Sequence, residues 1–254
     1  MTDLSQMLPD GSNPEGVDPV PPLNWTSTSD LTDVVVHGPV ISPPTTKLRC
    51  YLTFAGIPHD HKQHMFSWPM GFKPGTDYKK VPIIDVAGRQ VNDSAIILKY
   101  LLPVLGIAFD QEWEDRFVLE LDTSFKLHCT AEDWGRLATV TMGIPGFVRF
   151  VAGPLFQGME RKQALRNIAT SGLGHVEIDE ADLARDFRAS MKGKFHNGET
   201  AGHADLSLYG FLAGYILARS PIALTLIARA DLQEWVAAMD QIVPMRSLFP
   251  AARA

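Results

Sequence analysis

The sequence predicts an α/β domain followed by an all-helical domain, and two observations support that division. Between residues 34 and 102, short β-branched runs alternate with two helical patterns in the order β-α-β-β-β-α. From Asp110 onward, apolar residues recur only at helical spacing. The composition changes near Gly106, so we expect a leader over residues 1–30, an α/β domain over 31–104 and a helical domain over 105–254.

The α/β domain is expected to consist of short segments bounded by Gly and Pro. Thr45–Phe54 places Leu48, Tyr51 and Leu52 on one helical face, and Gly56 ends that helix. The other expected elements are strands over 33–37 and 58–64, a hairpin of 81–85 and 89–91 around Ala87–Gly88, and a helix over 93–102 that Pro103 stops.

The helical domain is expected to hold six segments, with a kink or break at Pro154 in the second of them. They cover residues 112–142, 145–168, 179–192, 204–218, 222–230 and 231–242.

The bulk composition excludes several classes of partner. The 254 residues are 45% hydrophobic and carry a formal net charge of −6, so we do not expect a broad basic surface or a nucleic-acid partner. No apolar run reaches the ~18 residues that a membrane span needs. Cys50 and Cys129 fit no metal-binding pattern and indicate a reducing compartment, so we expect a cytoplasmic protein without a bound metal.

The leader over residues 1–30 is rich in Pro, Gly, Ser and Asp, and the first basic residue of the chain is Lys47. It contains neither a secretory nor an organellar targeting signal. This composition predicts a disordered acidic leader. The alternative is an arm that becomes ordered on a partner, with Leu23 and Trp25 as its anchors.

The most informative stretch runs from Tyr78 to Ile97. Pro82 stands at the start of a strand, and a cis Val81–Pro82 bond would present the Val81 backbone N–H and C=O to a ligand. Asp93 and Ser94 then open a helix, where backbone donors collect an anion. A strand edge and a helix N-terminus that face one cleft can hold a small peptide-like ligand by both its ends.

These residues resemble those of the glutathione transferase superfamily, in which a thioredoxin-like domain precedes a helical one. The stretch Tyr78–Ile83, with Val91–Ile97, is most similar to the prostaglandin E synthase type 2 branch. Lys47–Arg49 with Phe54–Pro58 agrees with that branch, and Ala204–Gly210 is similar to the start of the buried core helix of these proteins. The resemblance covers roughly residues 34 to 242.

The resemblance implies a glutathione site. The Val81 backbone, before the cis Pro82, would pair with the cysteinyl part of glutathione in the manner of strand addition. Asp93 and Ser94 would bind the γ-glutamyl group, and Lys80 would add positive charge near the glycine carboxylate. The alternative is that the proline and the Asp-Ser cap only build this domain, which they would do without a ligand.

The sequence departs from this family at the start of the first helix. Where the branch has Cys-x-x-Cys, this chain reads Ser42-Pro43-Pro44-Thr45, so no thiol is present. Ser42, or else Thr45 or Thr46, is a candidate donor to the glutathione sulfur, which would stabilise the thiolate by ~1–2 kcal/mol. The competing interpretation is that these hydroxyls only cap the helix.

A second departure lies in the helical domain. Gly202 stands where the core helix of the family has a capping Ser or Thr three residues before Asp205.

Histidines and aromatic residues supply further candidates. His59, His61 and His64 allow a metal interpretation, against which an exposed polar strand face is preferred. His37 is a candidate base or haem ligand near the cleft; haem with glutathione occurs in the resembled branch, but nothing in this sequence selects for it. An apolar wall for a co-substrate would be formed by Phe66, Trp68, Met70 and Phe72, with Trp113, Trp134 and Met142 opposite.

Two functions follow from these observations. The first is an enzyme that uses glutathione to conjugate or reduce a small hydrophobic electrophile, with Ser42 as the catalytic residue. The second is a non-catalytic relative that serves as an interaction or assembly subunit, in a homodimer or a larger complex.

Overall fold

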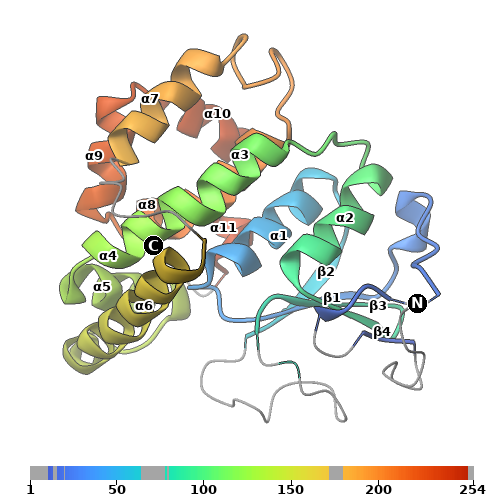
Figure 1. Cartoon of the computed structure of the whole chain (residues 1–254), viewed down its shortest axis with the longest axis horizontal. Coiled ribbons are helices and arrows are strands. Elements are labelled where there is room, and N and C mark those ends of the chain that lie inside the picture. The colour runs from blue at the N-terminus through green and yellow to red at the C-terminus, as the bar shows by residue number, and fades with distance from the viewer. Residues whose placement is uncertain are drawn as a thin grey trace. The chain divides into compact units, whose positions relative to one another are not determined.

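The computed structural model describes residues 11–13, 16–19, 21–63, 78, 80–171 and 180–250. The chain divides into two compact units, Met1–Phe109 and Asp110–Ala254 (Figure 1). The first unit is an α/β domain of the thioredoxin-like type and the second is all-helical. Within the described ranges, no helix is both long enough and apolar enough to cross a membrane.

A four-stranded mixed sheet forms the centre of the first unit, in the order β2-β1-β3-β4. β1 pairs in parallel with β2 and antiparallel with β3, and β3 pairs antiparallel with β4. The parallel pair requires a crossover, which α1 supplies. The strands are β1 Val34–His37, β2 His59–Lys62, β3 Ile83–Val86 and β4 Arg89–Asn92.

Two helices, α1 (Pro43–Phe54) and α2 (Ser94–Val104), lie side by side on one face of this sheet (Figure 1). The core between these layers is apolar: Val36, Leu52, Ile84 and Ile97 are each fully buried. Burying such side chains is worth roughly 1.5–3 kcal/mol each, which fixes the helices on the sheet.

The prediction that Pro103 stops the second helix is wrong, because α2 continues through Pro103 to Val104. Gly106 follows the C-cap Leu105, and its φ of 68° is the left-handed conformation that glycine adopts without strain after a helix end. The N–H of Gly106 donates to the Pro103 carbonyl at 3.2 Å, and this closes the last turn.

The described part of the leader is ordered against the sheet, which differs from the expected disorder. Asn92 N–H donates to Asn13 Oδ1 at 2.8 Å, and Asn13 Nδ2 donates back to the Asn92 carbonyl at 3.2 Å. Gln90 N–H donates to Ser12 Oγ at 2.9 Å. The leader therefore satisfies backbone groups of the edge strand β4.

The alternative expectation, an arm that becomes ordered on a partner through Leu23 and Trp25, also differs from the structure. Leu23 is buried within this chain, whereas Trp25 is only half-buried. Arg89 donates to the carbonyls of Gly11 and Pro21, at 3.0 and 2.8 Å, and so holds two points of the leader at the start of β4.

The second unit consists of helices of unequal length. The elements are α3 Gln111–Asp115, the π-helical η4 Arg116–Leu121, α4 Asp122–His128, α5 Ala131–Met142, the 3₁₀ turn η5 Gly146–Val148, α6 Arg149–Ser171, α7 Glu180–Ser190, α8 His203–Leu217, α9 Pro221–Arg229, α10 Gln233–Ile242 and α11 Met245–Leu248. The short helix α11 was not expected from the sequence.

The single helix expected over residues 112–142 is wrong. The chain leaves the helical conformation at Cys129, which is extended, and α5 starts again at the N-cap Thr130. Asp133 N–H donates to Thr130 Oγ1 at 3.2 Å, and Thr130 N–H donates to Asp133 Oδ2 at 2.9 Å. These reciprocal bonds form a capping box, which is a start signal for a helix rather than part of its interior.

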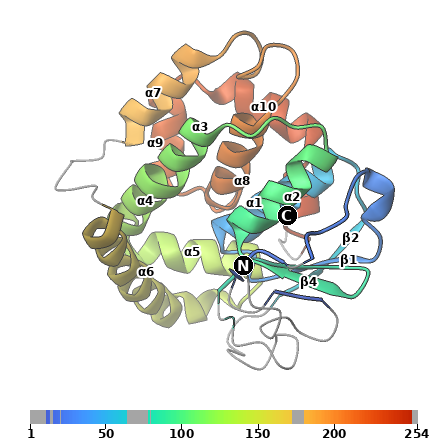
Figure 2. The ribbon, with the colours of Figure 1, turned by 45° about the vertical axis from the view of Figure 1, so that its right-hand side comes forward.

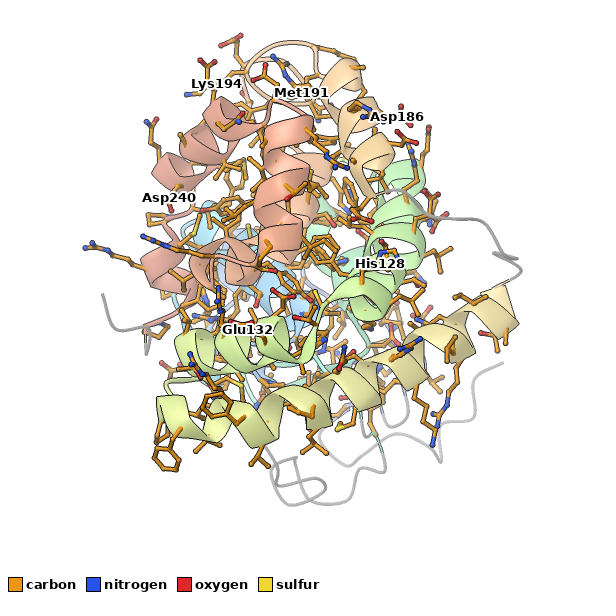
Figure 3. All side chains as sticks on the ribbon, turned by 90° about the vertical axis from the view of Figure 1, so that its left-hand side faces the viewer. His128, Glu132, Asp186, Met191, Lys194 and Asp240 are labelled. Atoms are coloured by element: carbon orange, nitrogen blue, oxygen red, sulfur yellow. The ribbon has the colours of Figure 1, made fainter. Side chains whose placement is uncertain are left out.

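The first part of α6 packs against α5 and its middle packs against α4, as can be followed in Figures 2 and 3. A β-carbon at Gly153 would stand 2.0 Å from the Ala131 carbonyl oxygen, and one at Gly135 would stand 2.8 Å from the Arg149 carbonyl oxygen. Glycine at these two positions therefore permits the close approach of the helices. Pro154 lies inside α6 without ending it.

Helix α8 lies in the middle of the helical unit (Figure 2), and every residue from His203 to Tyr215 is buried. Its N-cap is Gly202, whose N–H donates to the Asp205 carboxylate at 2.9 Å. The same carboxylate accepts hydrogen bonds from His196 N–H at 3.0 Å and from Trp235 Nε1 at 2.9 Å. Burial raises the pKa of Asp205, and these three hydrogen bonds oppose that rise.

Candidate functional site

The candidate site residues lie at one edge of the sheet, where three strands begin or end together. In the strand register, His37 at the end of β1 faces Ile83 at the start of β3, and Ile83 faces Asn92 at the end of β4. The segments 38–42, 80–82 and 93–94 adjoin these positions in the chain. The sequence does not show that these segments lie together, because Ser94 follows Ser42 by 52 positions.

The three hydroxyl groups at the start of α1 have different surroundings. Thr46 Oγ1 donates to the Val40 carbonyl at 3.0 Å and is buried. Thr45 is completely buried. Ser42 is the N-cap residue of α1, but its half-buried side chain makes no capping hydrogen bond. Among the three candidates, Ser42 is therefore the one whose hydroxyl is both accessible and not engaged in a cap.

Gly38 lies between the start of α1 and the segment that contains Val81. Its φ is 148°, and a β-carbon there would stand 2.4 Å from Thr45 Oγ1 and 3.2 Å from Val81 Cβ. Its carbonyl oxygen accepts a hydrogen bond from His61 Nε2 at 2.8 Å. This position requires glycine. The Val81–Pro82 peptide bond is cis; Val81 is half-buried and Pro82 is buried.

Asp93 acts as the N-cap of α2, because its Oδ1 accepts a hydrogen bond from Ala95 N–H at 2.9 Å. The leader contacts the same side chain: a β-carbon at Gly16 would stand 3.1 Å from Asp93 Cβ and 3.5 Å from Asp93 Oδ2. Tyr78 lies beside them, and burial raises the pKa of its phenol. Asp93 is therefore a structural cap covered in part by the leader.

Ser94 faces a shallow hollow between the first turns of α1 and α2. The hollow is lined by Pro44, Lys47, Leu48, Ser94 and Leu98. Lys47 is buried, and Ser94 stands in the first turn of α2, where a helix N-terminus favours negative charge. Lys47 was not predicted as a site residue; in the sequence it stands on the same side of the helix as Tyr51, four residues later.

Lys80 is exposed beside the site. His37, at the end of β1, is half-buried.

The sequence predicts that the histidines of β2 lie on an exposed polar face, and the structure differs. His59 and His61 are half-buried, whereas Asp60 and Lys62 between and after them are exposed. Burial lowers the pKa of His61 to about 4, and the nearby Arg49 guanidinium contributes. The same causes lower the pKa of His59. No group of metal-binding side chains gathers anywhere in the described parts of the chain.

The aromatic wall expected from Phe66, Trp68, Met70 and Phe72 lies outside the described residues, as does His64. Of the residues expected opposite them, Trp113, Trp134 and Met142 belong to the second unit, where all three are buried in the helical core.

Comparison with curated proteins finds two plant relatives. Glutathione S-transferase U17 of Arabidopsis thaliana is 26% identical over 187 residues, which is 72% of this chain and 73% of the relative. Glutathione S-transferase U4 of the same plant is 25% identical over 228 residues, or 86% of this chain and 89% of the relative. The sequence similarity is to glutathione transferases.

No family model matches the chain. Among solved structures, the tau-class glutathione S-transferase of mango, Mangifera indica, has a TM-score of 0.45 at 17% identity, with 87% of this chain and 97% of that chain covered. The sequence similarity to the second curated relative covers 86% of this chain and so includes parts of both units; the names of the two curated relatives support the glutathione transferase superfamily rather than a particular substrate.

Proposed function

We propose that the protein is a glutathione transferase-like enzyme that joins glutathione to a small hydrophobic electrophile. One observation carries the proposal: the Ser42 hydroxyl, free of a capping bond, stands at the start of α1 on the sheet edge that Val81 and Ser94 adjoin. The glutathione transferase names of the two plant relatives support it.

The parts of glutathione have separate partners in this proposal. The Val81 backbone N–H and C=O pair with the cysteinyl unit, as in strand addition. The Ser94 hydroxyl and the first N–H groups of α2 receive the γ-glutamyl carboxylate, with Lys47 of α1 nearby. The exposed Lys80 attracts the glycine carboxylate. Asp93 acts through α2, by capping the helix that presents Ser94.

Ser42 then activates the thiol. Its hydroxyl donates a hydrogen bond to the glutathione sulfur, which favours the thiolate by ~1–2 kcal/mol. The thiol proton leaves to solvent and the thiolate attacks an electrophilic carbon. As the sulfur–carbon bond forms, either the bond from that carbon to a leaving group breaks and the leaving group departs with the electron pair, or the π bond of an activated double bond opens and its electron pair takes a proton from solvent. The start of α1 adds to this effect, since a helix N-terminus stabilises negative charge.

Calorimetric titration of glutathione tests the binding half of the proposal. We expect saturable binding to the intact chain and a loss of affinity of at least about fivefold in Ser94→Ala, because the carboxylate loses a charge-assisted hydrogen bond. The matched control Thr225→Ala removes an exposed hydroxyl of α9 and leaves binding unchanged. Absence of binding at millimolar glutathione would overturn the proposal.

A second candidate function rests on the leader. Gly16 lies against Asp93, and the start of α1 has no cysteine; both features suit a non-catalytic relative that acts as an interaction or assembly subunit. A chain that fails to bind glutathione but co-purifies with a partner through residues 1–30 would favour this function.

Further details belong to the same proposal. The stretch from Tyr78 to Ile97 favours the prostaglandin E synthase type 2-like branch. The buried, unpaired Cys50 and Cys129 agree with a cytoplasmic enzyme. A homodimer is also part of the proposal. Haem plays no part in the proposal.

A further inference from the structure

The outer side of α6, together with the turn η5 before it, carries large apolar side chains that the helical unit leaves uncovered. Phe147, Val151 and Phe150 are 77%, 73% and 70% exposed, and three further side chains along the helix are more than half exposed. We define the α6 outer face as Phe147, Phe150, Val151, Leu155, Met159 and Leu165. In Figure 3, α6 runs along the outside of α5, and side chains project from it away from the other helices.

The inner side of α6 packs against the other helices of the unit, so the exposed face is not a packing surface of the unit itself. Ala152 and Ala164 are buried, and Gly153 is in contact with the Ala131 carbonyl. A set of protruding apolar side chains of this size on a folded chain marks a surface that contacts something else.

The charges on α6 indicate which kind of surface this face contacts. Four of its five charged residues are cations, and all four are exposed: Arg149, Arg161, Lys162 and Arg166. The one carboxylate, Glu160, points inward and lies 3.5 Å from Lys126 of α4. Within the described residues, no carboxylate pairs with any of the four cations. This helix is therefore basic in a chain whose net charge is −6.

We infer that the α6 outer face docks onto an anionic lipid surface. A helix with exposed Phe and Leu side chains and with cations beside them lies in the headgroup layer, with its apolar side chains in the acyl boundary and its cations on the lipid phosphates. The face protrudes, so it needs no matching groove in a partner. A second copy fits less well, because two such helices would bring like charges together.

Sedimentation with lipid vesicles tests the inference on the full chain. We expect binding to phosphatidylcholine vesicles with about 30 mol % phosphatidylserine, little binding to phosphatidylcholine alone, and loss of binding in about 0.5 M salt. The variants Phe147→Ala/Phe150→Ala and Arg161→Glu/Lys162→Glu/Arg166→Glu should each weaken partitioning by at least about tenfold.

Matched controls separate the face from general hydrophobicity and charge. Leu224→Ala/Ile242→Ala removes two exposed apolar side chains elsewhere, and Lys192→Glu/Arg229→Glu/Arg246→Glu changes the net charge by the same amount as the triple variant on α6. Both controls should bind vesicles as the parent chain does. Circular dichroism should show unchanged helix content in all variants, since every altered side chain is exposed.

Two results would overturn the inference. One is equal vesicle binding by the parent chain and both α6 variants, or no binding by any of them. The other is a parent dimer that Phe147→Ala/Phe150→Ala converts to a monomer in analytical ultracentrifugation, without vesicle binding, which would make the face a contact between copies. The glutathione titration is independent of each outcome.

Discussion

Three hydroxyl groups stand within five residues at the start of α1, and their surroundings distinguish them. Thr46 Oγ1 donates to the Val40 carbonyl and Thr45 is completely buried, so the half-buried Ser42, which makes no capping hydrogen bond, is the donor that we propose for the sulfur. The sequence predicts the same preference, but it cannot exclude that Ser42 caps the helix. That question depends on the geometry of one side chain, which composition and spacing do not determine.

Ser42→Ala should lower turnover with a model electrophile at least about tenfold, because the sulfur loses its hydrogen-bond donor. Glutathione affinity should stay nearly unchanged, since the hydroxyl does not hold the peptide. The control Thr46→Val removes a hydroxyl from the same helix and should leave turnover intact. An unchanged rate in Ser42→Ala would assign Ser42 to the fold rather than to the chemistry.

His61 makes stability depend on pH, because the folded protein resists its protonation. Its pKa is about 4, against an ordinary value of 6.5. Above pH 6.5 the imidazole is neutral in both states. Below it, the unfolded chain binds a proton that the folded chain does not, so the free energy of unfolding falls by on the order of 1.4 kcal/mol per pH unit until about pH 4.

Urea denaturation of His61→Gln between pH 4 and 6.5 tests this dependence. Glutamine keeps a donor for the Gly38 carbonyl but does not titrate, so the stability of the variant should fall less steeply with acid than that of the parent. Identical slopes in His61→Gln and the parent would contradict the role of His61.

The elements divide into those that local sequence determines and those that depend on distant contacts. Strand β1, helix α1 and the hairpin around Ala87–Gly88 follow from a β-branched run, apolar spacing and a glycine, whereas β2 contains no β-branched residue. The break at Cys129 also had a local signal, the Thr130–Asp133 capping box, which the longer apolar pattern obscured. The leader had no such signal, because its order comes from hydrogen bonds to Gln90 and Asn92, more than 70 residues away.

Asn13→Ala should lower the free energy of unfolding by about 1–3 kcal/mol, because the buried Asn92 N–H loses its acceptor. Asn24→Ala changes an exposed asparagine of the same leader and should have little effect. Chemical denaturation measures the free energy of unfolding of both variants and of the parent chain. Equal stability of the two would mean that the leader does not contribute to the folded state.

At the scale of the whole molecule, the order of the secondary structure and the two-part architecture are predictable from the sequence. The convergence of Ser42, Val81 and Ser94 at one sheet edge is not, because it depends on strand register, and register is set by contacts between segments. The exposed face of α6 is likewise invisible in the sequence: its apolar residues have the same helical spacing as those of a buried helix, and only packing shows which side remains open.

The leader on β4 has a consequence for how the molecule behaves at high concentration. An uncovered outer strand offers unpaired N–H and C=O groups on which strands of other molecules can assemble. The contacts of Ser12 and Asn13 block that route along β4, which leaves β2, with its exposed Asp60 and Lys62, as the other outer strand. Charged side chains discourage such growth. Removal of the first twenty residues would therefore favour aggregation through the sheet, even where the domain itself still folds.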